Sequence, residues 1–162
     1  MSNFDDRLAK AIERGQVRGA HREAAERARQ LTEEELKQLH TQYRLQFSEH
    51  IERCLRPLPS HFPGFQFETV FGERGWGAAC SRDDVDAGSG GRRANFYSRL
   101  EMTIRPYSSL HVVDLAAKGT IRNREVFTRN HYELLNDVDP ETFLHLIDVW
   151  VLEYAELFAA NR

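Results

Sequence analysis

The sequence has little cysteine and no long apolar run. Its 162 residues hold two cysteines, Cys54 and Cys80, and no Cys-x-x-Cys pair, so neither a disulfide framework nor a zinc finger is expected. No apolar stretch approaches the roughly 18 residues that a membrane helix needs. The first thirty residues are rich in Arg, Glu and Asp and lack the apolar centre of a signal peptide. We therefore expect a cytoplasmic protein that does not enter a membrane.

Motifs for common enzyme chemistries are also missing. No Gly-x-Ser-x-Gly elbow occurs, and the run Asp83-Asp84-Val85-Asp86, followed by Gly88-Ser89-Gly90-Gly91, fits neither an EF-hand nor a P-loop. Cys54 falls on the apolar stripe of a predicted helix, and Cys80 has the inward register of a predicted strand, which is typical of an inert buried thiol. We predict no catalytic residue and no cofactor, and we expect a non-enzymatic protein.

Charge is unevenly distributed along the chain. The net charge is −3, and it divides into +1 for residues 1–56, +2 for residues 57–130 and −6 for residues 131–162. A domain that coats nucleic acid usually has a pI above about 9. The balance therefore disfavours general nucleic-acid binding but leaves room for a local basic patch.

The pattern of apolar residues predicts an α+β fold. Residues 1–30 carry few large apolar side chains and predict a loosely attached helical arm, because such a helix buries little surface. Residues 31–162 predict a single domain. It has a long helix that starts at a Thr32–Glu35 capping box, an antiparallel meander of about five strands, and a C-terminal helix capped by Asp139, with both helices on one sheet face.

Two turns are predicted within the meander. Residues 81–93 have a broken apolar pattern and several glycines, which indicates a mobile loop. Lys118-Gly119 is a tight-turn signal and predicts a hairpin between strands at 110–117 and 120–128.

Arginines and a tyrosine are predicted to share the polar face of the sheet. Alternation in Phe96–Ile104 directs Tyr97, Arg99 and Arg105 away from the core, and the predicted neighbouring strand adds Arg122 and Arg124, with Arg129 as a further candidate. Arginine binds anions, and an interleaved aromatic can stack on a base. The alternative is an ordinary solvated face held by Arg–Glu pairs.

Three side chains of the last predicted helix form a possible metal-binding set. Glu141, His145 and Asp148 recur at i, i+4 and i+7 and therefore share a helix face that could serve Fe(II) or Mn(II). Matching ligands on a second helix are missing unless His40 or His50 lies nearby. A solvated helix edge is the preferred interpretation, and no metal is predicted.

The leading functional hypothesis is protein interaction. The apolar arc of the last helix is broader than contact with one side of a small domain can bury. We therefore expect Trp150, Tyr154 and Phe158 to form the interface of a homodimer, in a self-associating scaffold, adaptor or chaperone-like protein. One alternative is a binder of an anionic ligand or single-stranded nucleic acid on the arginine face. Another is a small enzyme or ligand-binding domain with a pocket under residues 81–93. No family motif is matched.

Overall fold

The computed structural model describes residues 3–31, 33–87 and 93–161, and the chain divides into two compact units, residues 1–38 and 39–162. The first unit consists of α1 (Asn3–Leu31) and the start of α2 (Glu33–Leu55). The predicted capping box lies partly outside the described residues, at Thr32. The predicted N-terminal helix is therefore present over nearly the whole of its expected length.

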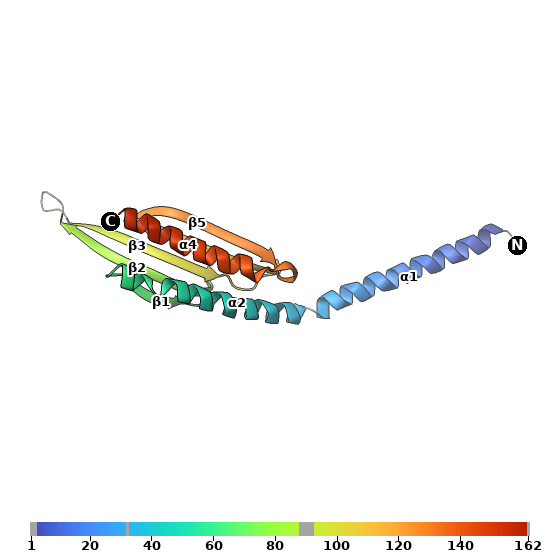
Figure 1. The fold of residues 1–162 in the computed structure, drawn as a ribbon. Helices are drawn as coiled ribbons and strands as arrows, with labels where there is room; N and C mark the ends of the chain where they lie inside the picture. The colour runs from blue at the N-terminus through green and yellow to red at the C-terminus, as the bar shows by residue number, and fades with distance from the viewer. Residues whose placement is uncertain (1–2, 32, 88–92, 162) are drawn as a thin grey trace. The chain divides into compact units, whose positions relative to one another are not determined.

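The second unit is built on one antiparallel sheet of five strands in the order β1-β2-β3-β4-β5 (Figure 1). Each strand pairs with its sequence neighbours, which is the predicted meander. The predicted α+β fold is thus confirmed. The strands span β1 Gln66–Val70, β2 Trp76–Ala87, β3 Arg93–Ile104, β4 Val112–Ile121 and β5 Arg124–Leu134.

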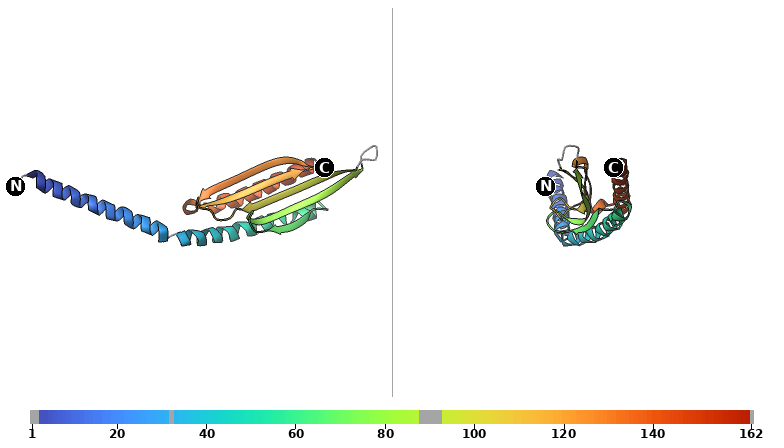
Figure 2. Two further views of the ribbon diagram at one scale, coloured as in Figure 1. Left: turned by 180° about the vertical axis from the view of Figure 1, so that it is seen from behind. Right: turned by 90° about the vertical axis from the view of Figure 1, so that its left-hand side faces the viewer.

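Helices cover one face of this sheet. Viewed from behind, the strands lie in front of α4 (Pro140–Ala160), and among the described residues of the second unit no helix lies on the opposite face (Figure 2). The short helix α3 (Leu58–His61) leads from α2 to β1, and a 3-10 turn, η1 (Leu135–Asp137), leads from β5 to α4. We call the sheet face away from α2 and α4 the open face.

The core lies between the sheet and the two helices. Phe47 of α2 stacks on Phe143 of α4 with ring centroids 4.7 Å apart, which joins the helices to each other. Inward-facing residues of the strands complete the core. Alternate residues of β3 are fully buried, as the sequence predicts. Side chains with no exposed surface include Ile51, Leu55, Leu100, Met102, Ile104, Val113, Leu115 and Ile147.

The start of α4 follows directly from its sequence. The Asp139 side chain accepts a hydrogen bond from the Glu141 amide at 3.2 Å, and Pro140 occupies the first turn. The carboxylate satisfies an amide that has no partner inside the helix, and proline loses nothing there. The predicted N-cap is confirmed.

The residues predicted as an interface belong to the core of the chain itself. Trp150, Tyr154 and Phe158 are only 7%, 0% and 3% exposed, and the Tyr154 hydroxyl donates to the Thr120 carbonyl at 2.8 Å. The structure therefore corrects the sequence-based assignment, because a five-stranded sheet with α2 beside it covers nearly all of the apolar arc. Leu152 of α4 stays 66% exposed.

The two predicted turns are also corrected. Residues 81–87 continue β2, so the loop between β2 and β3 is shorter than predicted, and residues 88–92 lie outside the described part of the chain. Lys118 and Gly119 lie within β4, and the hairpin turns at Arg122 and Asn123, whose φ angles are 49° and 71°. Positive φ at both central residues is the geometry of a type I′ turn.

Gly119 has a packing role in place of a turn. A Cβ at this position would lie 3.1 Å from Cζ of Phe127 and from Cδ2 of Tyr154. The missing side chain makes room for both rings, and a β-bulge follows at Gly119/Thr120. Gly119, which resembles a turn signal in the sequence, is therefore a strand residue whose lack of a side chain lets the rings of Phe127 and Tyr154 pack.

Candidate functional site

The open face of the sheet is the first candidate site, and it carries three of the predicted residues. Arg99 and Tyr97 of β3 point to this face, as does Arg105 just after β3. Arg99 is partly covered, whereas Tyr97 and Arg105 are exposed. The strand alternation that predicted them is confirmed, because Ser98, Leu100 and Met102 between them are buried.

Carboxylates neutralise most of the arginines on the open face. Arg99 donates to Glu68 of β1 at 2.7 Å and to Glu101 at 3.4 Å, and Glu101 lies 3.8 Å from Arg74. Arg105 lies 3.6 Å from Asp114 of β4. The Arg99–Glu68 pair spans β2 to join β3 with β1, and the Arg105–Asp114 pair joins the end of β3 to its neighbour β4. Such charge pairs are ordinary on an exposed sheet face.

Charge pairing also affects the ionisation of Arg99. Partial burial tends to lower the pKa of Arg99. The hydrogen bond to Glu68 and the charge of Glu101 outweigh burial and raise this pKa above its ordinary value. The guanidinium thus stays charged and is already held by two carboxylates. An incoming anion would compete with these contacts.

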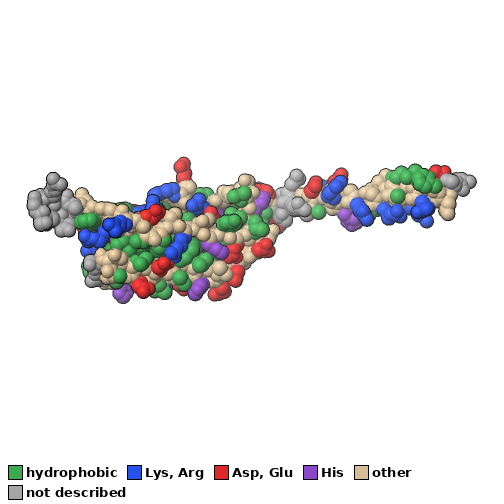
Figure 3. Space-filling model, turned by 90° about the horizontal axis from the view of Figure 1, so that it is seen from above, with side chains coloured by type: hydrophobic (Ala, Val, Ile, Leu, Met, Phe, Trp, Pro, Cys, Tyr) green, Lys and Arg blue, Asp and Glu red, His purple; other side chains and the backbone are tan. Residues whose placement is uncertain are grey.

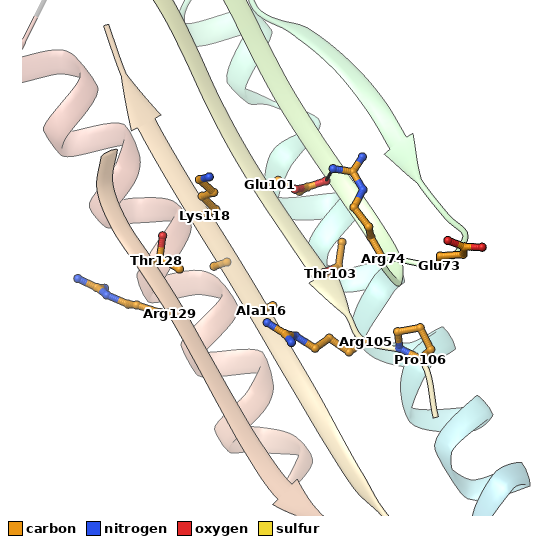
Figure 4. Close-up of a pocket in the computed structure, with 11 residues that line it drawn as sticks. Glu73, Arg74, Glu101, Thr103, Arg105, Pro106, Ala116, Lys118, Thr128 and Arg129 are labelled. Atoms are coloured by element: carbon orange, nitrogen blue, oxygen red, sulfur yellow. Dashed lines mark ion pairs between the residues drawn. The ribbon is translucent and has the colours of Figure 1, made fainter. Parts of the chain in front are cut away.

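Two hollows lie side by side on the open face and share Arg74, Glu101 and Lys118. The close-up in Figure 4 shows the hollow between Arg74 and Arg105, a cavity of about 440 Å³. Thr103 and Ala116 lie at its floor and Arg105 lies at its side. Arg129 points away from it, since that side chain reaches Glu153 of α4. The hollows are mixed in charge, with arginine, lysine and glutamate on their walls.

Arg122 and Arg124 lie on the opposite, helix-covered face. The Arg122 guanidinium stands 4.1 Å above the ring of Phe96, and with Asn161 of the α4 end it lines a hollow of about 350 Å³. Arg124 pairs across the hairpin with Ile121, which is buried. The predicted five-residue anion surface is therefore divided between two faces, because the real turn and the bulge change which side each residue takes.

A second candidate lies between α2 and α4, where three metal-ligating side chains meet. His50 Nε2 donates to Asp148 Oδ1 at 2.7 Å, and the Cys54 thiol donates to the same oxygen at 3.3 Å. Sγ of Cys54 is 3.6 Å from Nε2 of His50. Asp148 belongs to the predicted metal-binding set, and among the described residues His50 and Cys54 are its partners in the three-residue cluster.

The electrostatics of this cluster follow from its hydrogen bonds. Burial, together with the hydrogen bond to Asp148 and the charge of that carboxylate, raises the pKa of the Cys54 thiol to about 12. Burial tends to raise the pKa of Asp148, but the hydrogen bonds from His50 and Cys54 lower it below its ordinary value. Without a cation the thiol is therefore protonated and weakly nucleophilic.

Sequence reasoning named His50 as a residue that could supply a missing ligand from a second helix, but it missed Cys54 as a member of the site. Their spacing of four residues places both on one side of a helix and was a visible signal. Asp148 follows 94 residues after Cys54, so its approach depends on how α4 packs.

The side chains of α1 form the third candidate surface. From residue 3 to residue 27, every side chain of this helix is exposed apart from the glycine at position 19. Phe4, Leu8, Ile12 and Val17 are 64%, 46%, 54% and 51% exposed. Figure 3 shows hydrophobic side chains on one side of α1 near its N-terminal end and Lys and Arg side chains on the other.

Comparison of the chain with protein-family models, with curated proteins and with solved structures gives no match. Among the described helices, none is long and apolar enough to cross a membrane.

Proposed function

We propose that this chain is a non-enzymatic protein-interaction protein, of the scaffold, adaptor or chaperone-like kind, that self-associates through α1. The observation that carries the proposal is the exposure of Phe4, Leu8 and Ile12 on a 29-residue helix. Their spacing of four residues places them on one side of the helix. The sequence predicted an interface on α4, whereas the proposed contact surface lies on α1. The difference arises because Trp150, Tyr154 and Phe158 of α4 are buried in the core of the chain itself.

Energetics favour a partner for this surface. Fully burying a large apolar side chain stabilises by about 1.5 to 3 kcal/mol. Phe4, Leu8 and Ile12 are 64%, 46% and 54% exposed, so burying what remains of the three offers about 2 to 5 kcal/mol to an association before its entropic cost. A helix whose apolar side is unburied is only marginally stable in water. Contact with a second copy would bury the stripe and support the helix at the same time.

The alternative functions are less well supported. Anion or nucleic-acid binding needs available cations, whereas Arg99 and Arg105 lie against the carboxylates of Glu68 and Asp114 from other strands of the sheet. Catalysis needs an activated group, whereas burial raises the pKa of both thiols, to about 12 at Cys54 and about 11 at Cys80.

The test is the oligomeric state of the full chain. Sedimentation velocity over a range of concentrations should show a dimer or higher oligomer for the wild type and a monomer for the triple variant Phe4→Ser, Leu8→Ser and Ile12→Ser. A matched control, Arg7→Gln with Arg14→Gln, changes two exposed cations of the same helix and should keep the association. A wild-type chain that stays monomeric at the highest concentration, or a triple variant that associates as well as the wild type, would refute the proposal.

A further inference from the structure

The cluster between α2 and α4 brings three different ligand atoms to one point. His50 and Cys54 come from successive turns of α2, and Asp148 comes from the facing surface of α4. The imidazole and the thiol both point to a single oxygen, Oδ1 of Asp148. One nitrogen, one sulfur and one oxygen therefore converge between the two helices.

The spacing of these atoms is close to that around a tetrahedral metal ion. Zinc bonds of about 2.3 Å to sulfur and about 2.0 to 2.1 Å to nitrogen and oxygen give ligand-to-ligand distances of about 3.3 to 3.6 Å. The Sγ to Nε2 and Sγ to Oδ1 distances are 3.6 and 3.3 Å. The Nε2 to Oδ1 distance is shorter, at 2.7 Å, because a hydrogen bond closes it. An ion would need to separate this pair by about 0.6 Å and the Sγ–Oδ1 pair by about 0.3 Å.

The chemistry of the donors selects the metal. Calcium and magnesium prefer oxygen ligands in larger number, whereas sulfur together with imidazole suits a borderline-soft divalent ion. We propose that His50, Cys54 and Asp148 form a zinc-binding site with a fourth position open to water. Zinc there would tie α2 to α4 through bonds that replace the present hydrogen bonds.

The surroundings allow an ion to enter. The side chains of His50 and Asp148 are 20% and 49% exposed, so the site opens to solvent at the surface. His145 lies one helical turn before Asp148, and its charge acts on that carboxylate. The site is therefore accessible while Cys54 remains half-buried beneath it.

Cobalt titration of the untagged full chain tests the proposal, because cobalt replaces zinc in tetrahedral sites and reports sulfur ligation by a charge-transfer band. Reduced, metal-free protein should bind one Co²⁺ with that band and with intense visible absorption, and Zn²⁺ should displace it. Cys54→Ser should abolish the band, whereas Cys80→Ala should keep it. His50→Gln should weaken Co²⁺ binding by at least about 100-fold, since loss of even an outer-shell partner costs about 10- to 100-fold.

A matched histidine provides the control for the last variant. His131 also contacts a carboxylate, Glu133, at 2.6 Å, but it is not a member of the three-residue cluster. His131→Gln should therefore bind Co²⁺ like the wild type. Circular dichroism of each variant separates loss of a ligand from loss of the fold, and Asp148→Asn supplies a second ligand variant. A wild-type titration without a charge-transfer band, or a band that persists in folded Cys54→Ser protein, would overturn the proposal.

Discussion

Replacing Asn123 by alanine tests the hairpin between β4 and β5. Oδ1 of Asn123 accepts from the Tyr97 amide at 2.8 Å, and its Nδ2 donates to the Asn95 carbonyl at 2.8 Å. The φ angle of 71° lies in the left-handed region, which asparagine tolerates and alanine does not. Asn123→Ala therefore loses two hydrogen bonds and gains backbone strain.

The magnitude follows from these two contributions. Each hydrogen bond contributes about 0.5 to 1.5 kcal/mol, and because both are exposed we take the lower part of that range. The left-handed backbone costs an ordinary residue about 1 to 2 kcal/mol. Asn123→Ala should thus lower the free energy of unfolding by about 2 to 3 kcal/mol. Asn123→Gly should lower it by about 1 kcal/mol, since glycine removes the strain but not the loss of hydrogen bonds.

Urea unfolding followed by circular dichroism measures the effect as a lower midpoint with an unchanged slope. Asn130→Ala in β5 is the control, because Asn130 makes one long contact, at 3.4 Å to Asp114, and its substitution should stay within about 0.5 kcal/mol. If the hairpin turned at Lys118 and Gly119, Asn123 would be an ordinary strand residue. An Asn123→Ala variant as stable as the wild type would therefore refute the observed turn.

Two further predictions concern the core. His40 is 3% exposed and its Nε2 has no hydrogen-bond partner among the described residues; burial, with a smaller contribution from Arg44, lowers its pKa despite a hydrogen bond to the Arg105 backbone. Below a pH of about 6.5 the unfolded chain protonates His40 more readily than the folded chain does, so the free energy of unfolding should fall as the pH falls. His40→Phe should remove this part of the pH dependence, measured by urea unfolding at several pH values. A pH profile of stability that His40→Phe leaves unchanged would contradict this role of His40. Gly119→Ala should lower the free energy of unfolding by about 1 to 3 kcal/mol through overpacking, measured by urea unfolding. Gly15→Ala in α1, where a new Cβ meets nothing within 4 Å, should not lower stability, and an equally mild effect at Gly119 would be inconsistent with the packing described.

Local sequence signals predicted the elements that depend on neighbouring residues. Asp139 and Pro140 marked the start of α4, and alternation marked β3 and placed Tyr97 and Arg99 on the open face. Caps and alternation act over a few residues, so the sequence contains everything that decides them.

The candidate sites were less predictable because their members depend on distant contacts. Arg122 and Arg124 changed face once the turn moved from Gly119 to Asn123, since a small change in register reverses the side of every following residue. Trp150 was predicted as part of an interface, but the area that a sheet covers on a helix cannot be read from the helix alone.

The sequence by itself determined that the chain has few cysteines, no membrane-length apolar run in the expected helices, an apolar-poor first helix and a strand meander between two helices. Each of these properties is a matter of composition or short-range periodicity. Tertiary structure alone decided that the apolar residues of α4 are buried and that Asp148 meets His50 and Cys54. The physical reason is that packing of α4 against α2 joins residues almost a hundred positions apart, and no local pattern carries that distance.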